Sequence, residues 1–337
     1  MATPEVAVIG AGPVGLFTVF QCGTLGMRCH VIDALGHVGG QCAALYPEKP
    51  IYDVAGLPTI KGAELVANLE AQALPFAPIY HLGERVEKLV QGQDGQWLLT
   101  TSVGAEIAVR AVVVAAGAGA FVPNRPPLQG IEAFEGRSVF YSVGRVEDFA
   151  GRRVVIAGGG DSAVDWTLSL AETGAKVFLV HRRDRFRAAP DSVERLRRLE
   201  ADGIVETLVP YQLAALHGDG GQLAAVDIVS LDGRQRRLEA DILLPMFGLS
   251  SDLGAIAGWG LDMVGGRIPV DPMTCATARA GIVAVGDVAC YPGKLKLMLT
   301  GFAEAAHAAH ALRAFLRPGE PLHFQHSTSR GLPAAAA

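Results

Sequence analysis

Short runs of apolar residues, each closed by a glycine-rich turn, recur along the chain and predict buried strands. The first run, residues 5–9 (EVAVI), is followed by the turn 10–15 (GAGPVG) and by a helical pattern that extends to about Leu25. A second short run, residues 29–32 (CHVI), ends at Asp33. This order of strand, turn, helix and strand is typical of a parallel α/β sheet, whose strands are buried on both faces.

The same order occurs a second time in the middle of the chain. Residues 153–157 (RVVIA) form the predicted strand, 158–163 (GGGDSA) the turn, 164–173 the helix and 177–180 the second strand. The sequence therefore contains an internal repeat. Its 337 residues are too many for one ordinary core and suit two domains.

Both turns have the spacing G-x-G-x-x-G/A, which favours dinucleotide binding. The first glycine allows a sharp turn, the second lets the backbone approach a pyrophosphate, and the small third residue lets helix and strand pack closely. The pyrophosphate then lies at the helix N-terminus, where free N–H groups and the helix dipole favour an anion. The residues expected to contact the two dinucleotides are Gly10, Gly12, Pro13 and Gly15 in the first copy, and Gly158, Gly160, Asp161, Ser162 and Ala163 in the second.

The residue after the second strand of each copy predicts which dinucleotide binds. Asp33 lies 23 positions after Gly10, where a carboxylate accepts hydrogen bonds from ribose hydroxyls and repels a 2′-phosphate. The matching position of the second copy opens a basic segment, whose guanidinium groups favour a 2′-phosphate. We therefore expect FAD in the first copy and NADPH in the second, the latter held by His181, Arg182, Arg183 and Arg187. The alternatives are that both turns are only structural and that residues 181–198 are a solvated basic helix face.

Composition and charge narrow the function further. The formal net charge of −5 argues against nucleic-acid binding. No apolar stretch reaches the ~18 residues of a membrane span, and the N-terminus lacks a signal-peptide pattern, so we expect a cytoplasmic protein without membrane contact. The five cysteines include no C-x-x-C, and an odd number in a cytoplasmic chain suggests reduced thiols in place of a disulfide framework. We expect no metal site.

Two later segments add to this picture. Residues 111–117 (AVVVAAG) predict another buried strand, and residues 281–287 (GIVAVGD) predict a strand that closes on Gly-Asp. A carboxylate at Asp287 is suited to accept hydrogen bonds from a ribityl chain. The helix expected at about 296–316 would direct its N-terminus toward flavin N1 and O2.

These motifs and their order resemble the two-dinucleotide-binding flavoprotein reductases, of which thioredoxin reductase is the compact form. Asp33 and the segments 112–117 and 286–287 match FAD-domain motifs, and residues 181–188 match the NADPH phosphate motif H-R-R-D-x-F-R-A. The resemblance implies an α/β protein with two Rossmann-like dinucleotide-binding domains, the NADPH domain inserted into the FAD domain. The expected limits are 1–119 and 247–337 for the discontinuous FAD domain and 120–246 for the NADPH domain.

The chain departs from this family at the positions of the redox-active cysteines. Residues 139–153 contain no cysteine, whereas thioredoxin reductase has a C-x-x-C there. The larger disulfide reductases have a C-x-x-x-x-C beside the flavin; here Cys42 takes the first position and Pro47 the second. A dithiol reductase is therefore not expected, and we interpret Cys42 as a small buried residue.

One subgroup fits the whole chain. Residues 45–49 (LYPEK), 52–56 (YDVAG), 158–166 (GGGDSAVDW) and 326–329 (HSTS) resemble the thioredoxin-reductase-like ferredoxin/flavodoxin–NADP⁺ reductases. In these homodimers Tyr46 and the partner chain's copy of His326 would cover the two faces of the isoalloxazine ring. The resemblance implies further FAD contacts at Gly40, Gln41, Tyr46, Val86, Phe121, Gly286, Asp287, His326 and Thr328.

The resemblance implies a ferredoxin (or flavodoxin)–NADP⁺ oxidoreductase, in which hydride passes between NADPH and flavin N5 and single electrons pass to the carrier protein. This hydride step needs stacking and close approach of the two rings, so we expect no catalytic acid, base or nucleophile from the protein. Because the carriers are acidic, a basic docking face is expected, with candidates Arg195, Arg197, Arg198, Lys294 and Lys296. The alternatives are a general NADPH-dependent flavin reductase acting on quinones, ferric chelates or another protein, and a flavin-binding redox sensor. The intact phosphate motif weighs against the sensor.

Overall fold

The computed structural model describes residues 4–321 of the chain, which divide into two compact units. Unit 1 comprises residues 4–121 and 251–321, and unit 2 is the continuous segment 122–250 between them. The limits expected from the sequence, after residues 119 and 246, lie two and four residues earlier. The difference arises in the two connections, which pair as strands β10 (Ala120–Pro123) and β18 (Leu249–Asp252).

Unit 1 is built on a five-stranded parallel sheet. Its strands are β1 (Val6–Ile9), β2 (Cys29–Asp33), β5 (Ile79–Leu82), β9 (Ala111–Val114) and β20 (Ile282–Ala284), in the order β20-β9-β1-β2-β5. The chain adds β2 and β5 on one side of β1, and β9 and β20 on the other. Such a reversal of strand order opens a crevice at the carboxyl ends of the strands.

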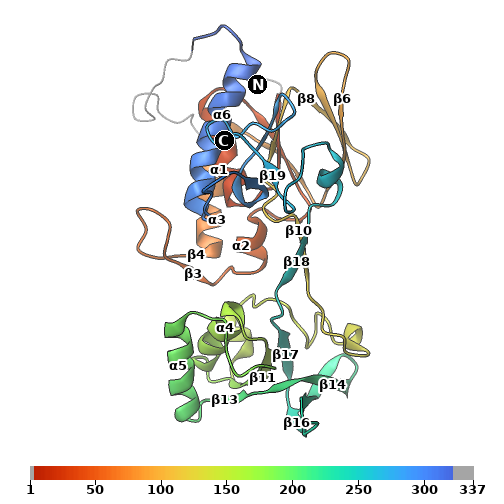
Figure 1. Ribbon diagram of the computed structural model, residues 1–337, viewed down its shortest axis with the longest axis vertical. Coiled ribbons are helices and arrows are strands. Elements are labelled where there is room, and N and C mark those ends of the chain that lie inside the picture. Colours follow the sequence, from red (N-terminus) through yellow and green to blue (C-terminus); the bar gives the residue numbers. More distant parts are fainter. Residues whose placement is uncertain (1–3, 322–337) are drawn as a thin grey trace. The chain divides into compact units, whose positions relative to one another are not determined.

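Alternation along β1 explains how both faces of this sheet are covered. Val6 and Val8 pack on the helical face, against α1 (Pro13–Thr24) and α6 (Met298–Leu316). These helices and α3 (Gly62–Ala73) lie side by side in Figure 1. Ala7 and Ile9 point to the opposite face because neighbouring strand residues alternate.

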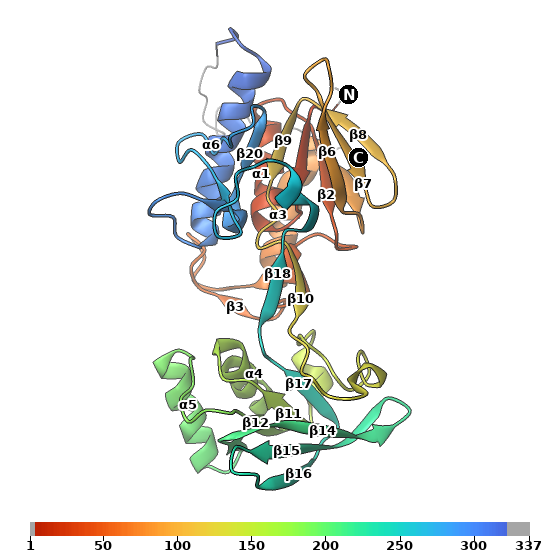
Figure 2. The same cartoon turned by 45° about the vertical axis from the view of Figure 1, so that its right-hand side comes forward.

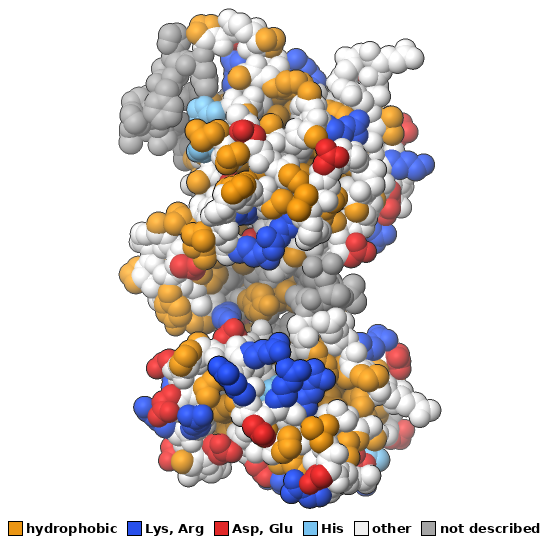
Figure 3. Space-filling view, viewed as in Figure 1, with side chains coloured by type: hydrophobic (Ala, Val, Ile, Leu, Met, Phe, Trp, Pro, Cys, Tyr) orange, Lys and Arg blue, Asp and Glu red, His pale blue; other side chains and the backbone are white. Residues whose placement is uncertain are grey.

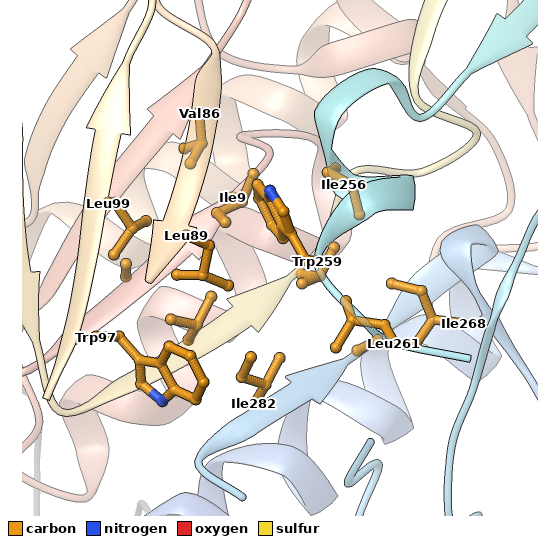
Figure 4. Packing of buried hydrophobic residues seen from close by; sticks show 14 of the residues in the cluster. Ile9, Val86, Leu89, Trp97, Leu99, Ile256, Trp259, Leu261, Ile268 and Ile282 are labelled. Atoms are coloured by element: carbon orange, nitrogen blue, oxygen red, sulfur yellow. The ribbon is translucent and has the colours of Figure 1, made fainter. Parts of the chain in front are cut away.

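The opposite face of the sheet is covered by an antiparallel ribbon, visible in Figure 2, and by the segment after β18. The ribbon consists of β6 (Val86–Gln91), β7 (Trp97–Thr101) and β8 (Glu106–Val109). Figure 4 shows the apolar side chains of this layer, with Trp97 and Trp259 among them, directed toward one another. The shorter elements of unit 1 are α2 (Gly40–Ala44), β3 (Pro50–Ile51), β4 (Ile60–Lys61), β19 (Ile268–Pro269), β21 (Ala289–Cys290), and the 3₁₀ turns η1 (Leu74–Phe76), η4 (Gly254–Gly258) and η5 (Gly286–Val288).

Unit 2 repeats the same plan with fewer strands. Its parallel sheet has the order β13-β12-β11-β17, with β11 (Arg153–Ala157), β12 (Lys176–Val180), β13 (Val205–Leu208) and β17 (Ile242–Pro245). One face packs on α4 (Asp161–Ala171) and α5 (Pro190–Ala201). The other packs on an antiparallel meander of β14 (Tyr211–Asp219), β15 (Gln222–Ser230) and β16 (Gln235–Glu239). Two 3₁₀ turns, η2 (Ile131–Ala133) and η3 (Val146–Phe149), complete the unit.

The α/β class with two Rossmann-like units is confirmed, and unit 2 interrupts unit 1 along the chain. In both repeats the strand, glycine turn, helix and second strand follow in the predicted order. Several elements differ in their bounds. The strands expected over 111–117 and 281–287 end at Val114 and Ala284, the helix expected over 164–173 spans Asp161–Ala171, and the helix expected from 296 begins at Met298. Within residues 4–321 no helix combines the length and the apolar character that crossing a membrane requires.

Candidate functional site

A cavity of about 490 Å³ lies in unit 1, at the carboxyl ends of β1, β2, β9 and β20. It brings together three segments that are far apart in the sequence: the first glycine turn, the end of β2 and the Gly-Asp turn after β20. The sequence-predicted residues that line it are Gly10, Gly12, Pro13, Asp33, Gly40, Gln41, Val86, Gly286 and Asp287. Its place at the reversal of strand order is where α/β sheets bind ligands.

The three glycines of the first turn have different roles. Gly10 has a φ of +107°, and a Cβ there would lie 2.4 Å from the carbonyl oxygen of Ala115. A Cβ on Gly15 would lie 1.9 Å from the carbonyl oxygen of Gly10, so α1 packs against the turn only because this side chain is missing. A Cβ on Gly12, by contrast, would meet only the Cα of Gly40, at 4.0 Å. The missing side chain of Gly12 therefore leaves space in the cavity for another molecule.

Asp33 is held at the end of β2 by backbone hydrogen bonds. Its Oδ2 accepts the N–H of Ala11 at 2.6 Å, and its Oδ1 accepts the N–H of Leu35 at 2.8 Å. Burial raises the pKa of this carboxyl group, and the two hydrogen bonds oppose that rise. The carboxylate is thus oriented beside the glycine turn, where a ribose would lie.

Parts of the cavity wall carry no signal in the sequence. They come from the start of β6 and from the end of β18 and the segment after it. These residues are Glu84, Arg85, Glu87, Asp252, Leu253, Gly254, Ala255 and Ile256. Lys296, Leu297 and Met298 also line the cavity, at the helix start that the sequence placed beside the flavin. Leu297 is the N-cap residue of α6, so the N-terminus of this helix borders the cavity.

Five other predicted FAD contacts are not among the described lining residues, and one of them, Gly15, serves the packing of α1 on its turn. His326 and Thr328 lie outside the described residues, and of Phe121 only the backbone, in β10, is described. Tyr46 does not line the cavity. It is half-buried in the loop after α2, with the Nζ of Lys49 5.8 Å from its ring centroid.

Among residues 4–321, Cys42 lines the cavity and no second thiol does. Burial raises the pKa of Cys42, and the carboxylate of Asp287 raises it further. Thiol–disulfide exchange requires a thiolate and a partner sulfur. This cavity therefore lacks the parts of a dithiol reductase, in agreement with Pro47 at the second cysteine position.

Unit 2 holds the second glycine turn, between β11 and α4. The imidazole of His181, at the end of β12, lies directly against Gly159, where a Cβ would come within 2.2 Å of its Cε1. The ring stacks on Phe186 with 5.2 Å between the centroids, and its buried Nε2 has no hydrogen-bond partner among the described residues. Burial lowers the pKa of His181, and the neighbouring arginines lower it further.

The arginine segment is attached to this turn through its backbone. The N–H of Arg187 donates to the carbonyl of Gly159 at 2.7 Å, and the N–H of Ala189 donates to Oδ1 of Asp161 at 2.9 Å. The side chains of Arg182, Arg183 and Arg187 are exposed, and none forms an ion pair with a carboxylate within residues 4–321. Figure 3 shows Lys and Arg side chains grouped on one face of unit 2, near α4. The charge and hydrogen-bonding groups suit a phosphate beside the start of α4.

The sequence is similar to that of known proteins. Residues 4–311 match the model of the family described as "Pyridine nucleotide-disulphide oxidoreductase". A ferredoxin–NADP reductase of Paramagnetospirillum magneticum is 58% identical over 98% of both chains. One of Rhodospirillum rubrum is 57% identical over 99% of this chain and 97% of its own.

Solved structures of lower identity share the fold. Thioredoxin reductase of Lactococcus lactis has a TM-score of 0.76 at 23% identity, covering 93% of this chain and 99% of its own. Thioredoxin reductase of T. acidophilum has the same TM-score at 20% identity, covering 92% of this chain and 97% of its own. The chain belongs to the pyridine nucleotide-disulphide oxidoreductase family, and its sequence places it with the ferredoxin–NADP reductases of that family.

Proposed function

We propose that this protein is a ferredoxin–NADP⁺ oxidoreductase that binds FAD in unit 1 and NADPH in unit 2. One contrast carries the proposal. Equivalent positions of two equivalent folds hold a carboxylate, Asp33, and a basic segment that begins at His181. Two dinucleotides of different phosphate content are therefore bound by one chain, and the full-length likeness to ferredoxin–NADP reductases supports the same use.

In unit 1 the chain's task is to hold and orient FAD. The turn at Gly12 would receive the pyrophosphate, Asp33 the adenosine ribose, and Asp287 the ribityl chain. When bound, FAD supplies the two-electron to one-electron chemistry. The positive end of the α6 dipole, at Leu297 and Met298, favours negative charge in the cavity and so favours a reduced cofactor.

In unit 2 the residues select the nucleotide. Exposed guanidinium groups at Arg182, Arg183 and Arg187 would bind the 2′-phosphate by charge and by paired hydrogen bonds. Gly160 and the N-terminus of α4 would receive the pyrophosphate. NADPH is accordingly preferred to NADH.

The electron carrier is a ferredoxin, or a flavodoxin of similar acidic character. Basic residues would bind it, and the exposed candidates are Arg195, Arg197 and Arg198 in unit 2 and Lys296 in unit 1. Lys294 was expected among them, and that expectation is wrong, because its side chain is 5% exposed and paired with a buried carboxylate. A homodimer located in the cytoplasm, with Tyr46 and His326 beside the flavin, stays a prediction.

The experiment is an anaerobic stopped-flow mix of the yellow protein with NADPH or NADH, followed by ferredoxin, with thioredoxin in a parallel run. We expect NADPH, but not NADH, to bleach the flavin rapidly. Ferredoxin should then reoxidise the flavin, and thioredoxin should not. Bleaching without reoxidation by ferredoxin would replace the proposal by a general NADPH-dependent flavin reductase, to be tested with quinones and ferric chelates. No bleaching with either nucleotide would contradict the NADPH site.

A further inference from the structure

Glu304 is a buried acid outside the dinucleotide motifs. It lies in the second turn of α6 and is 4% exposed. Its Oε2 accepts the N–H of Gly286 at 2.7 Å, and its Oε1 accepts the hydroxyl of Tyr291 at 2.7 Å. The same Oε1 pairs with the ammonium of Lys294, whose side chain is almost as deeply buried.

Packing alone does not account for this residue. The surrounding stretch of α6, residues 303–309 (AEAAHAA), is rich in alanine, and the face toward the sheet carries Ala305, Ala308 and Ala309, all fully buried. A buried ion pair is weak support for stability, because removing two charges from water costs about as much as their attraction returns. A carboxylate with three partners at this place therefore points to a positioning role.

The three partners of Glu304 all precede α6, in the segment that leads from β20 to the helix. Gly286 and Asp287 at the beginning of that segment line the cavity, and so do residues 296–298 at its end. Glu304 thus fixes a segment that forms two walls of the same cavity.

Close packing of helix and turn adds to this connection. Gly301, one turn before Glu304, lies where a Cβ would come within 2.5 Å of the Cγ2 of Val14 and 3.5 Å of the Cα of Gly286. The helix therefore approaches the Gly-Asp turn without an intervening side chain. The carboxylate one turn later holds that turn by its N–H, which sets the direction of the following residue, Asp287.

We propose that Glu304 is a positioning residue for FAD: its carboxylate, charge-balanced by Lys294, holds the Gly286–Asp287 turn against α6 in the geometry that binds the cofactor. The inference rests on the proposed function in taking FAD as the occupant of the cavity. It makes no use of NADPH or of the carrier. Lys294 serves here as the counter-ion that balances the charge of Glu304.

The test uses the whole flavoprotein and measures the FAD dissociation constant and the midpoint potential of the bound flavin. Glu304→Gln and Lys294→Met each remove one charge. We expect each to raise the dissociation constant by about tenfold, because a charge-assisted hydrogen bond contributes about that factor. Glu304→Gln should raise the midpoint potential, since it leaves the ammonium unbalanced, and Lys294→Met should lower it.

Three further variants separate positioning from general damage. The double variant Glu304→Gln/Lys294→Met restores neutrality and should return the potential to the wild-type value. Tyr291→Phe removes one hydrogen bond without a charge, and should weaken FAD binding at an unchanged potential. Glu5→Gln is the matched control, since Glu5 is a partly buried carboxylate paired with Arg317 at 2.6 Å, before the amino end of β1 and so remote from the cavity.

Two results would overturn the proposal. One is FAD affinity and potential in both single-charge variants equal to those of Glu5→Gln. The other is a shift of the potential in the same direction in both, which indicates loss of structure instead of loss of charge balance. Failure of the wild-type protein to reduce ferredoxin would contradict the proposed function but leave these measurements valid.

Discussion

At the scale of single residues, the two proposed nucleotide sites diverge from the position that follows the second strand, where the first has Asp33 and the second has His181 and the arginines after it. Asp33 accepts the N–H of Ala11 in the first glycine turn and the N–H of Leu35, and keeps a carboxylate at the cavity. His181 packs on Gly159 and places the arginines that follow it at the corresponding edge. Its Nε2 is buried without a partner, so the contribution of His181 in the described geometry is packing, and the guanidinium groups supply the charge.

This division of roles predicts a selective effect of Arg187. We expect Arg187→Gln to lower kcat/KM for NADPH by about tenfold or more, because it removes a charge-assisted hydrogen bond to the 2′-phosphate. The value for NADH should change less than twofold. Steady-state reduction of ferricyanide measures kcat/KM for NADPH and for NADH.

A suitable control is Arg197→Gln, which removes an exposed charge from α5 outside the motif. Equal losses with NADPH and NADH in Arg187→Gln would mean that the residue supports the turn through its backbone neighbourhood and does not read the phosphate.

At the scale of elements, glycine spacing and apolar runs predicted both repeats because these signals are local. A sharp turn needs glycine at its first position, and a strand buried on both faces needs consecutive apolar residues, whatever the rest of the chain does. The far walls of the cavity were not predictable in this way. Glu84 and Ile256 reach it only through the packing of the β6–β8 ribbon and the segment after β18 on the sheet.

The burial of Lys294 was likewise not predictable from the local sequence. In the sequence it is one lysine near another, Lys296, and a lysine is normally exposed. Its burial depends on Glu304, ten positions later, which only the fold brings to it. A single acid among the alanines of α6 was the available signal, and a helix pattern alone does not tell a buried acid from an exposed one.

The first glycine turn permits a paired prediction at this scale. Gly15→Ala should destabilise unit 1 by about 1–3 kcal/mol, because its Cβ would overlap the carbonyl oxygen of Gly10 at 1.9 Å. Gly12→Ala should change the unfolding free energy of the FAD-free protein by less than about 1 kcal/mol, since its Cβ meets open space. Its FAD dissociation constant should nevertheless rise strongly.

Urea unfolding of the FAD-free proteins and fluorescence titration with FAD measure the two effects separately. If Gly12→Ala bound FAD as tightly as the wild type, the space beside Gly12 would not be the pyrophosphate position.

At the scale of the whole molecule, insertion of one unit into another requires that the inserted unit begin and end at neighbouring points. Asn124, near the start of unit 2, is hydrogen-bonded to residues near the end of the unit. Its N–H donates to the carbonyl of Gly248 at 3.0 Å, and its side-chain amide donates to the carbonyl of Phe247 at 3.2 Å. Both buried clusters of the unit are formed by its own residues, from Leu128 to Met246.

Unit 2 should therefore fold when residues 122–250 are expressed alone, since its ends are joined and its core is its own. We expect a single cooperative urea transition and an NADP⁺ dissociation constant within about threefold of that of the whole protein, because every residue assigned to that nucleotide lies in this segment. Arg187→Gln in the fragment supplies the control, and should weaken NADP⁺ binding as it does in the intact chain. A fragment that folds but does not bind NADP⁺ would place part of the nucleotide site in unit 1, and then the selectivity expected of the arginines would depend on both units.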